Sequence, residues 1–210
     1  MTTERQNRVR AVLDKRQPDL TVLLEHVHKP HNLSAILRSC DAVGVLEAHI
    51  VALEGRVPTF NETSAGSDKW LPLHQHPNTQ NAFSSLRSKG FNVIAAHLSD
   101  TALDYREWDY TQPTAVLLGA EKWGVSSEAA NLADAHIIIP MQGMVQSLNV
   151  SVAAAVVLFE AQRQRLEAGL YNAPRLTQDQ YAKLEYEWLH PKEAEVLRNR
   201  GVPYPNLSLK

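Results

Sequence analysis

The chain has 210 residues, of which 44% are hydrophobic and 21% are charged. This is the composition of a soluble globular protein with one main domain. The single cysteine, Cys40, excludes an intrachain disulfide and suits a reducing compartment. The charged N-terminal residues argue against a secretory signal, and the longest apolar run, 150–159, is too short to span a bilayer. We therefore expect a cytoplasmic protein without a membrane segment.

Charge is distributed unevenly along the chain, whose formal net charge is −2. Residues 1–16 carry five basic and two acidic side chains, and residues 161–210 carry eight and six, so both ends are basic. The segment between them is acidic. Basic ends are suited to contact phosphates, although a surplus this small also occurs on ordinary solvated helices.

Predicted strands and helices alternate along the chain. A short basic helix is expected over 4–17, ending at Pro18. The expected strands span 21–27, 48–53, 91–97, 114–118 and 135–139, with a weaker one at 70–73. The expected helices span 33–43, 79–89, 127–133 and 147–168, and the glycines at their C-caps are Gly44, Gly90 and Gly169.

This alternation predicts an α/β domain with a mainly parallel sheet. We place it at 18–169, between a basic N-terminal helix at 1–17 and a C-terminal helical extension at 170–210. Within the extension, helices are expected near 178–189 and 192–200. The sequence contains no G-x-G-x-x-G at the first strand–helix junction and no P-loop motif, so an ordinary dinucleotide fold is not expected.

The predicted helix at 33–43 carries an apolar stripe with a single arginine opposite it. Arg38 falls on the far side of the stripe at 100° per residue, and Asn32 stands at the expected N-cap. Arg38 is either a surface residue paired with Asp41 or a guanidinium that binds a phosphate or a partner subunit. Spacing alone favours the surface interpretation.

The strand at 114–118 leads into a loop, 119–126, with two glycines and a tryptophan. Ligands of open α/β sheets bind beyond the carboxyl ends of the strands. Glu121 is therefore placed to bind a ligand or to act as an acid or base, or else it is an exposed loop residue. The residues leave both interpretations open.

A third segment, 137–152, joins a β-branched strand to an apolar helix through a polar loop. Ser147 and Asn149 open the helix in this interpretation, and polar groups in an apolar interior need hydrogen-bond partners. A strand end, a glycine loop and a helix N-terminus together suggest a ligand-binding turn. The alternative is a simple connection in which Ser147 caps the helix.

Nine histidines raise the question of a metal site. His26, His28 and His31 cluster, and His74 and His76 form an H-x-H pair. With neither a thiolate cluster nor an H-E-x-x-H motif, no metal site is expected. No Ser-His-Asp or Cys-His arrangement for nucleophilic catalysis is evident either.

Three blocks, in order, resemble the three motifs of the SPOUT-class RNA 2′-O-methyltransferases. The blocks are 32–38, 118–122, and 138–141 with 147–151. Further segments at 28–32, 97–100, 160–165 and 201–205 are similar to the TrmH type, which methylates guanosine 18 of tRNA. The resemblance covers most of 5–206 and is weaker over 55–90 and 170–195, and Ala96 and Trp123 depart from the pattern.

The resemblance implies a sheet whose C-terminal part is tied in a deep trefoil knot, an exception to the rule against threaded chains. It also implies a homodimer that binds S-adenosylmethionine in the knot, where three loops replace the missing G-x-G-x-x-G turn, and releases S-adenosylhomocysteine. The residues that these loops would place at the cofactor are Ala96, His97, Leu98, Gly119, Gly124, Ile139, Met141, Ser147 and Leu148.

The catalytic set implied by the resemblance is Arg38, Asn32, Glu121, Ser147 and Asn149. Arg38 has been proposed as the general base of this family. A guanidinium stays protonated at neutral pH, so a phosphate clamp that stabilises the developing oxyanion is the better fit. Glu121 is then a proton acceptor or an orienting group. The sequence leaves these roles open, and it leaves open which subunit supplies Arg38.

The expected tRNA contacts lie mainly in the basic ends, and they are Arg5, Arg8, Arg16, His31, Arg163, Arg165 and Arg175. Whether all tRNAs are substrates is left open. Two alternatives remain. One is the same reaction on ribosomal RNA or on a tRNA wobble ribose, and the other is a non-catalytic RNA-binding or assembly factor on the same fold.

Overall fold

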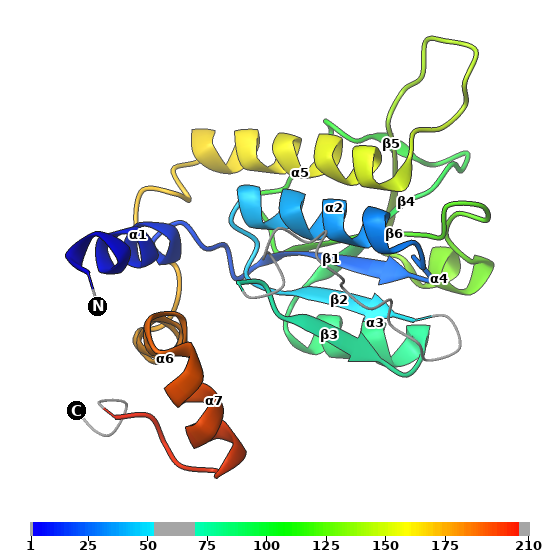
Figure 1. The fold of residues 1–210 in the computed structure, drawn as a ribbon. Helices are drawn as coiled ribbons and strands as arrows, with labels where there is room; N and C mark the ends of the chain where they lie inside the picture. The colour runs from blue at the N-terminus through cyan, green and yellow to red at the C-terminus, as the bar shows by residue number, and fades with distance from the viewer. Residues whose placement is uncertain (1, 53–69, 206–210) are drawn as a thin grey trace. The chain divides into compact units, whose positions relative to one another are not determined.

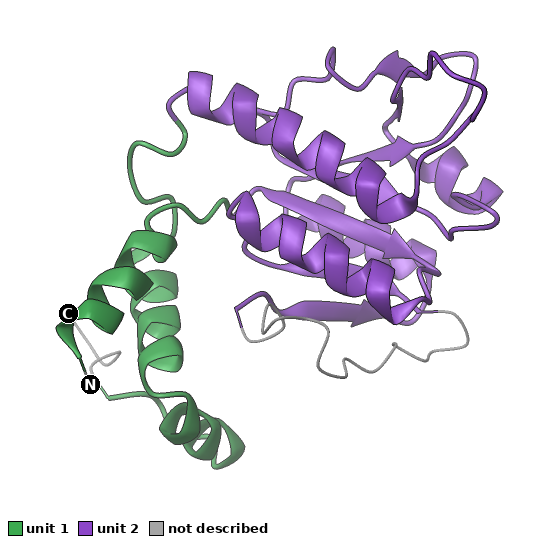
Figure 2. Ribbon diagram, turned by 45° about the horizontal axis from the view of Figure 1, so that its top comes forward, with its two compact units in different colours: residues 1–17, 170–210 green, residues 18–169 purple. Residues whose placement is uncertain are grey.

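The computed structural model describes residues 2–52 and 70–205. They form two compact units, one at 18–169 and one that combines the described residues of 1–17 and 170–210 (Figure 2). No sequence pattern indicated that the two ends of the chain associate.

The described residues of the unit at 18–169 form one seven-stranded sheet in which all neighbouring strands are parallel (Figure 1). The order across the sheet is β3-β2-β1-β6-β4-β7-β5. The strands are β1 (Leu20–Glu25), β2 (Ala48–Val51), β3 (Leu73–His76), β4 (Asn92–Ala96), β5 (Leu103–Asp104), β6 (Thr114–Leu118) and β7 (Ala135–Ile138). The predicted α/β fold with a parallel sheet is confirmed.

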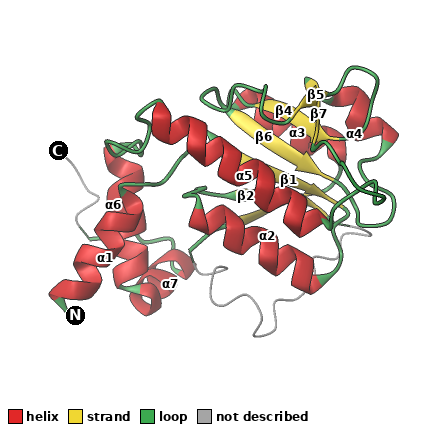
Figure 3. Ribbon diagram, turned by 90° about the horizontal axis from the view of Figure 1, so that it is seen from above, coloured by secondary structure: helices red, strands yellow, loops and turns green. Residues whose placement is uncertain are grey.

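Helices cover both faces of this sheet (Figures 1 and 3). The pair on one face is α2 (Pro30–Ala42) and α5 (Val150–Glu167), and the pair on the other face is α3 (Thr79–Ser88) and α4 (Ser127–Leu132). Side chains of β1 alternate between the two cores, with Val22 and Leu24 towards α2 and α5, and Leu23 towards α3 and α4. Burial on both faces explains why the central strands are continuous apolar runs.

Local residue chemistry accounts for the ends of the main helices. The apolar stripe of α2 is fully buried as predicted. Gly44, Gly90 and Gly169, which follow the C-caps of α2, α3 and α5, have φ values of +82°, +84° and +75°. Glycine adopts this left-handed backbone without steric cost, so the helices end where expected.

Two predicted helix starts near the site are wrong. α5 begins at Val150 and not at 147, because Asn149 caps it: its Oδ1 accepts a hydrogen bond from the Ser151 amide at 2.8 Å. α2 begins at Pro30, whose fixed φ suits a first helical turn. Asn32 therefore lies inside the first turn of α2 and is not its N-cap.

Other differences lie at the edges of the fold. The first helix, α1 (Thr3–Leu13), ends before residue 17, and β3 begins at residue 73, where the weak predicted strand ended. The two-residue strand β5 was not predicted. The last residue of the strand expected at 48–53 lies outside the described residues. Short edge strands carry too few residues for a sequence pattern to mark them.

The sheet order places the carboxyl ends of β6, β4 and β7 beside one another. β1 leads to β2 and β3 on one side, whereas β4 and β7 lie on the other side of β6. Ligands of open parallel sheets bind where the strand order switches direction in this way.

The second unit is helical and contains α1, α6 (Gln178–Leu189) and α7 (Pro191–Asn199). α1 packs against α6, where Arg10 pairs with Glu185 at 2.6 Å. Trp188 is buried beneath the guanidinium of Arg16, which lies 5.2 Å from the ring centroid. Within 2–52 and 70–205, no helix has the length and apolar character needed to cross a membrane.

Candidate active site

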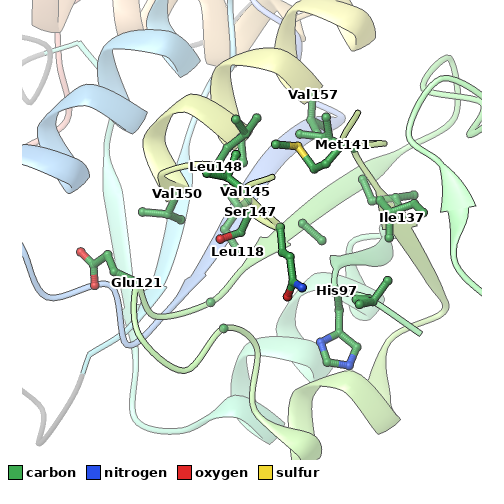
Figure 4. A pocket seen from close by; sticks show the side chains of 18 of the residues that line it. His97, Leu118, Glu121, Ile137, Met141, Val145, Ser147, Leu148, Val150 and Val157 are labelled. Atoms are coloured by element: carbon green, nitrogen blue, oxygen red, sulfur yellow. The ribbon is translucent and has the colours of Figure 1, made fainter. Parts of the chain in front are cut away.

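A cavity of about 740 Å³ opens at the carboxyl ends of β4, β6 and β7 (Figure 4). Three loops line it, at 96–98, 118–124 and 137–148. The volume is within the range of small-molecule sites. The structure brings together in this cavity every residue that the motifs assigned to the cofactor: Ala96, His97, Leu98, Gly119, Gly124, Ile139, Met141, Ser147 and Leu148.

The loop after β6 is a tight turn that depends on two glycines. Gly124 has φ +67°, and its amide donates to the carbonyl oxygen of Ala120 at 2.8 Å. A Cβ at Gly119 would overlap the backbone of Gly124 and Val125. Gly119 is therefore required for the loop to close, and the backbone itself lines the cavity here.

The far end of this loop is fixed to the sheet by a buried carboxylate. Glu25, at the end of β1, is 1% exposed. It accepts hydrogen bonds from the Ser126 amide at 2.8 Å, the Ser126 hydroxyl at 2.7 Å and the Thr79 hydroxyl at 3.0 Å. A buried charge needs such donors, so Glu25 holds the start of α4 in place. Sequence reasoning missed Glu25, although a single acid at the end of an apolar strand was a usable signal.

The loop between β7 and α5 is long and exposed. Met144 is fully exposed and Val145 is 64% exposed, whereas Met141 and Leu148 are half-buried. Val145, Met141 and Leu148 all line the cavity (Figure 4). Ser147 also lines the cavity but is exposed to solvent and does not cap α5. The expected burial of Ser147 in an apolar interior is therefore wrong for a single chain.

A directional chain of hydrogen bonds links α5, α2 and the loop after β6. Asn149 accepts from the Ser151 amide through Oδ1, so its Nδ2 donates to Asn32 Oδ1 at 3.2 Å. Asn32 Nδ2 then donates to the carboxylate of Glu121 at 2.7 Å. Because an ionised carboxylate only accepts, the orientation of both amides is determined. Three residues of the predicted catalytic set thus lie together.

The surroundings of Glu121 favour its ionised form. Burial tends to raise its pKa, but the hydrogen bond from Asn32, the backbone amides of Glu121 and Lys29, and the nearby ring of His28 together lower it below its usual value. His28 Nδ1 lies 3.2 Å from the second carboxylate oxygen. A carboxylate with a lowered pKa is a weak base, so it is better suited to orient Asn32 than to remove a proton.

Arg38 lies apart from this group. It is on the exposed side of α2, opposite the buried stripe, as the helical spacing predicted. It is not among the described residues that line the cavity. The geometry of a single chain therefore unites Asn32, Glu121 and Asn149 but does not bring Arg38 into the cavity.

Models of two known domain families match this chain. The model described as SpoU rRNA Methylase family matches residues 19–159, and the model described as SpoU, rRNA methylase, C-terminal matches residues 163–210. The chain belongs to the SpoU rRNA methylase family. The family membership expected from the three motifs is confirmed.

Relatives of this SpoU methylase match nearly its whole length. The tRNA (guanosine(18)-2'-O)-methyltransferase of Thermus thermophilus is 66% identical over 188 residues, covering 90% of this chain and 97% of the relative. The enzyme of the same name from Escherichia coli is 48% identical over 210 residues, covering 99% of this chain and 92% of the relative.

Solved structures agree with this similarity. The Aquifex aeolicus TrmH/SpoU tRNA modifying enzyme superposes with a TM-score of 0.84 at 43% identity, covering 90% of this chain and 96% of the other. The SpoU methyltransferase AviRb from Streptomyces viridochromogenes, in complex with the cofactor AdoMet, has a TM-score of 0.65 at 30% identity, covering 72% and 62%.

Two arginines that we expected to contact tRNA are buried in this SpoU methylase. Arg165 is 0% exposed and pairs with Asp19 at 2.7 Å, and it donates to the carbonyl oxygens of Tyr110 at 2.8 Å and Gln112 at 3.2 Å. Arg16 is also 0% exposed. A guanidinium without exposed surface cannot reach a phosphate, so these two predictions are wrong.

The other expected tRNA contacts stay predictions. Arg163 is on the surface of α5, where it pairs with Glu160 and Glu167 at 2.7 Å each. Such exposed pairs exchange readily with other partners because they contribute little stability. The remaining candidates are at least partly exposed, and they are Arg5, Arg8, His31 and Arg175.

The H-x-H pair lies on β3, away from the cavity. The ring of His49 stacks between those of His74 and His76, with centroid distances of 5.2 Å and 5.1 Å, and Glu47 lies 2.9 Å from His74 Nε2. No group of His, Cys, Asp and Glu within 2–52 and 70–205 is arranged to hold a metal ion. The expectation of a metal-free enzyme stays a prediction.

Three further cavity residues stand in the loops that the resemblance placed around the cofactor, although they were not named as site residues: Lys122, Trp123 and Gln146. The Lys122 amine lies 4.5 Å from the centroid of the Trp123 ring. Trp123 is 78% exposed. The tryptophan between two glycines had already marked its loop as unusual, whereas no residue type singled out Gln146 beside Ser147.

Proposed function

We propose that this protein transfers a methyl group from S-adenosylmethionine to the ribose 2′-hydroxyl of guanosine 18 in the D-loop of tRNA. The observation that carries the proposal is that the nine residues assigned to the cofactor from sequence motifs all line one cavity. Relatives at 66% and 48% identity bear the name tRNA (guanosine(18)-2'-O)-methyltransferase.

The residues of the cavity fit this cofactor. Ile137, Ile139 and Leu148 supply apolar walls for an adenine ring and a thioether, and the backbone of 119–124 supplies polar groups for ribose and amino acid. S-adenosylmethionine brings a methyl group on a positively charged sulfur, and S-adenosylhomocysteine is the product. The displacement requires alignment of the ribose hydroxyl with that methyl group and assistance in removing the hydroxyl proton.

Glu121 orients and does not act as the general base in this proposal. Its lowered pKa keeps it ionised, and through Asn32 and Asn149 it holds the start of α5 against the start of α2. Ser147, at the cavity, is the residue of this set left to contact ribose or cofactor. Arg38 clamps a phosphate and stabilises the oxyanion that develops as the hydroxyl attacks.

The position of Arg38 supports a homodimer in which one subunit completes the site of the other. α5, which packs beside α2, exposes Val152, Phe159 and Leu166, each about half exposed. Their seven-residue spacing makes an apolar stripe along one side of the helix, typical of a helix that packs against a partner. Pairing of two α5 helices brings each α2, with Arg38, towards the other subunit.

A trefoil knot over the C-terminal part of the sheet belongs to the same proposal. Its support is the strand order, since β6 lies between β1 and β4 although it follows β4 in sequence. A cytoplasmic location likewise stays a prediction.

A second candidate substrate is ribosomal RNA. The family model is described as an rRNA methylase, and a solved rRNA methyltransferase from Sinorhizobium meliloti bound to AdoMet has a TM-score of 0.63 at 33% identity. Relatives that match more of the chain bear the tRNA name, which favours tRNA. A non-catalytic RNA-binding protein is disfavoured by the intact chain Asn149–Asn32–Glu121.

Methylation of a defined transcript tests the proposal. The purified protein is incubated with labelled S-adenosylmethionine and a tRNA transcript, and the modified ribose is mapped. We expect 2′-O-methylguanosine at position 18, and no label in a matched transcript with 2′-deoxyguanosine there. Labelling of ribosomal RNA alone would select the second candidate. Absence of methyl transfer to either RNA would contradict the proposal that this protein is an RNA methyltransferase.

A further inference from the structure

His136, on β7, connects the first cavity loop to α4. Its Nδ1 lies 2.7 Å from the hydroxyl oxygen of Ser99, and its Nε2 lies 2.9 Å from the carbonyl oxygen of Ala130. Its ring also meets that of His97 edge-on, with a centroid distance of 5.4 Å. His136 thus contacts the loop that carries the cavity residues His97 and Leu98, yet it is not itself among the residues that line the cavity.

The two partners determine the direction of these hydrogen bonds. A carbonyl oxygen only accepts, so Nε2 carries a proton and donates to Ala130. In the neutral ring Nδ1 is then an acceptor, and the Ser99 hydroxyl donates to it. His136 therefore joins the first loop to the helix that follows the second loop.

Apolar packing does little to hold the first loop in place. Leu98, between His97 and Ser99, is 80% exposed. Backbone hydrogen bonds act at its two ends: the His97 amide donates to the carbonyl of Ile137 at 3.2 Å, and the Ala102 amide donates to the carbonyl of Ser99 at 3.1 Å. The side-chain link from Ser99 to His136 comes directly after the cavity residues and ties the middle of the loop to the sheet.

We propose that His136 is a positioning residue for S-adenosylmethionine. Through Ser99 it holds His97 and Leu98 at the cavity, and the bond from Nε2 to Ala130 serves only to fix the ring tautomer that leaves Nδ1 as an acceptor. The inference rests on the proposed function, because the cofactor is the ligand whose affinity it sets.

Two replacements of His136 separate its two hydrogen bonds. Gln places its amide nitrogen near the former Nε2 and retains the bond to Ala130, whereas Asn places its amide oxygen near the former Nδ1 and retains the acceptor for Ser99. Titration calorimetry with S-adenosylmethionine compares His136→Gln, His136→Asn, Ser99→Ala and the double variant His136→Gln with Ser99→Ala. The matched control is Ser88→Ala, which removes an exposed serine hydroxyl bonded to the carbonyl of Ser85.

We expect His136→Gln and Ser99→Ala each to weaken S-adenosylmethionine binding roughly three- to tenfold, the effect of one lost hydrogen bond. The double variant should match the single ones because both remove the same link. His136→Asn and Ser88→Ala should bind like wild type. In turnover assays the KM for S-adenosylmethionine should rise while kcat stays within about twofold, since no group at the reacting atoms changes.

Wild-type affinity in both His136→Gln and Ser99→Ala would overturn the inference and leave the proposed function standing. Losses that multiply in the double variant would also overturn it, because the two residues would then act independently. Absence of S-adenosylmethionine binding by wild type would instead contradict the proposed function. If His136→Gln fails to fold, Ser99→Ala with an unchanged Tm provides the test alone.

Discussion

The cavity in the unit at 18–169 and the basic ends of the chain differ in how well the sequence predicted their functional residues. All nine residues predicted to bind the cofactor line one cavity, whereas two of the arginines predicted to bind tRNA are fully buried. A glycine loop needs particular residues at particular places in the chain. An arginine is equally useful for joining distant segments of a fold and for binding a phosphate, so composition alone does not separate the two uses.

Arg165→Ala should have the largest effect on stability. Removal of the guanidinium takes the ion-pair partner from Asp19 and one donor from each of the carbonyls of Tyr110 and Gln112, which costs about 3–5 kcal/mol of unfolding free energy. Arg163→Ala, two residues away on the surface of α5, should cost far less, because an exposed ion pair contributes little stability. Urea unfolding measures both, and equal values for the two variants would show that burial does not distinguish them.

Gly119→Ala should damage the cavity more than the fold. A methyl group at this position meets the backbone of Gly124 and Val125, so the loop must open, with about 1–3 kcal/mol of strain and at least a tenfold loss of S-adenosylmethionine affinity. Gly90→Ala is the matched control, because its positive φ costs about 1 kcal/mol but lies outside the cavity. Comparable affinity in the two variants, measured by calorimetry, would show that closure of the loop is not needed.

The exposed basic residues should govern the salt dependence of tRNA binding. If Arg5, Arg8 and Arg175 each contact a phosphate, replacing all three with alanine should reduce the slope of log K against log salt by about three. Arg106→Ala, which removes an exposed arginine paired with Asp104, is the control and should leave the slope unchanged. An unchanged slope in the triple variant would show that these three arginines do not contact tRNA phosphates.

The smallest effect concerns the pH dependence contributed by Glu121. Its pKa in the folded protein is lowered from 4.5, so its ionised form stabilises the fold above that value, and this contribution is lost as the pH falls through the lowered pKa. The difference in unfolding free energy between wild type and Glu121→Gln should therefore shrink below about pH 4.5. Glu195→Gln, on the exposed surface of α7, is the control. If the difference in unfolding free energy between wild type and Glu121→Gln grew as the pH fell, the expected direction of the effect would be contradicted.

Much of the fold could be predicted because its signals are local. Apolar runs flanked by glycine C-caps marked the central strands and helices, and Gly119 and Gly124 marked the loop whose backbone must approach closely. The family expected from three motifs was confirmed on the same residues.

The features that escaped prediction depend on partners distant in the sequence. Arg165 is buried because Asp19, Tyr110 and Gln112 surround it, and no local pattern connects these residues. Glu25 and Ser126, which fix the second loop, are equally distant in the chain. The start of α5 was misplaced for a local reason, since Ser147 and Asn149 are both good capping residues and only the fold shows that Asn149 is used.

The central claim is that the cavity between the three loops holds S-adenosylmethionine, and Leu148→Asp tests it most directly. Leu148 is half-buried on the cavity wall, so a carboxylate there is tolerated by the fold but must be desolvated by a bound ligand. Calorimetry should show S-adenosylmethionine affinity reduced on the order of a hundredfold or more in Leu148→Asp. Leu103→Asp, which alters a partly exposed leucine outside the cavity, should bind as wild type does. Wild-type affinity in Leu148→Asp would place the cofactor elsewhere and contradict the account.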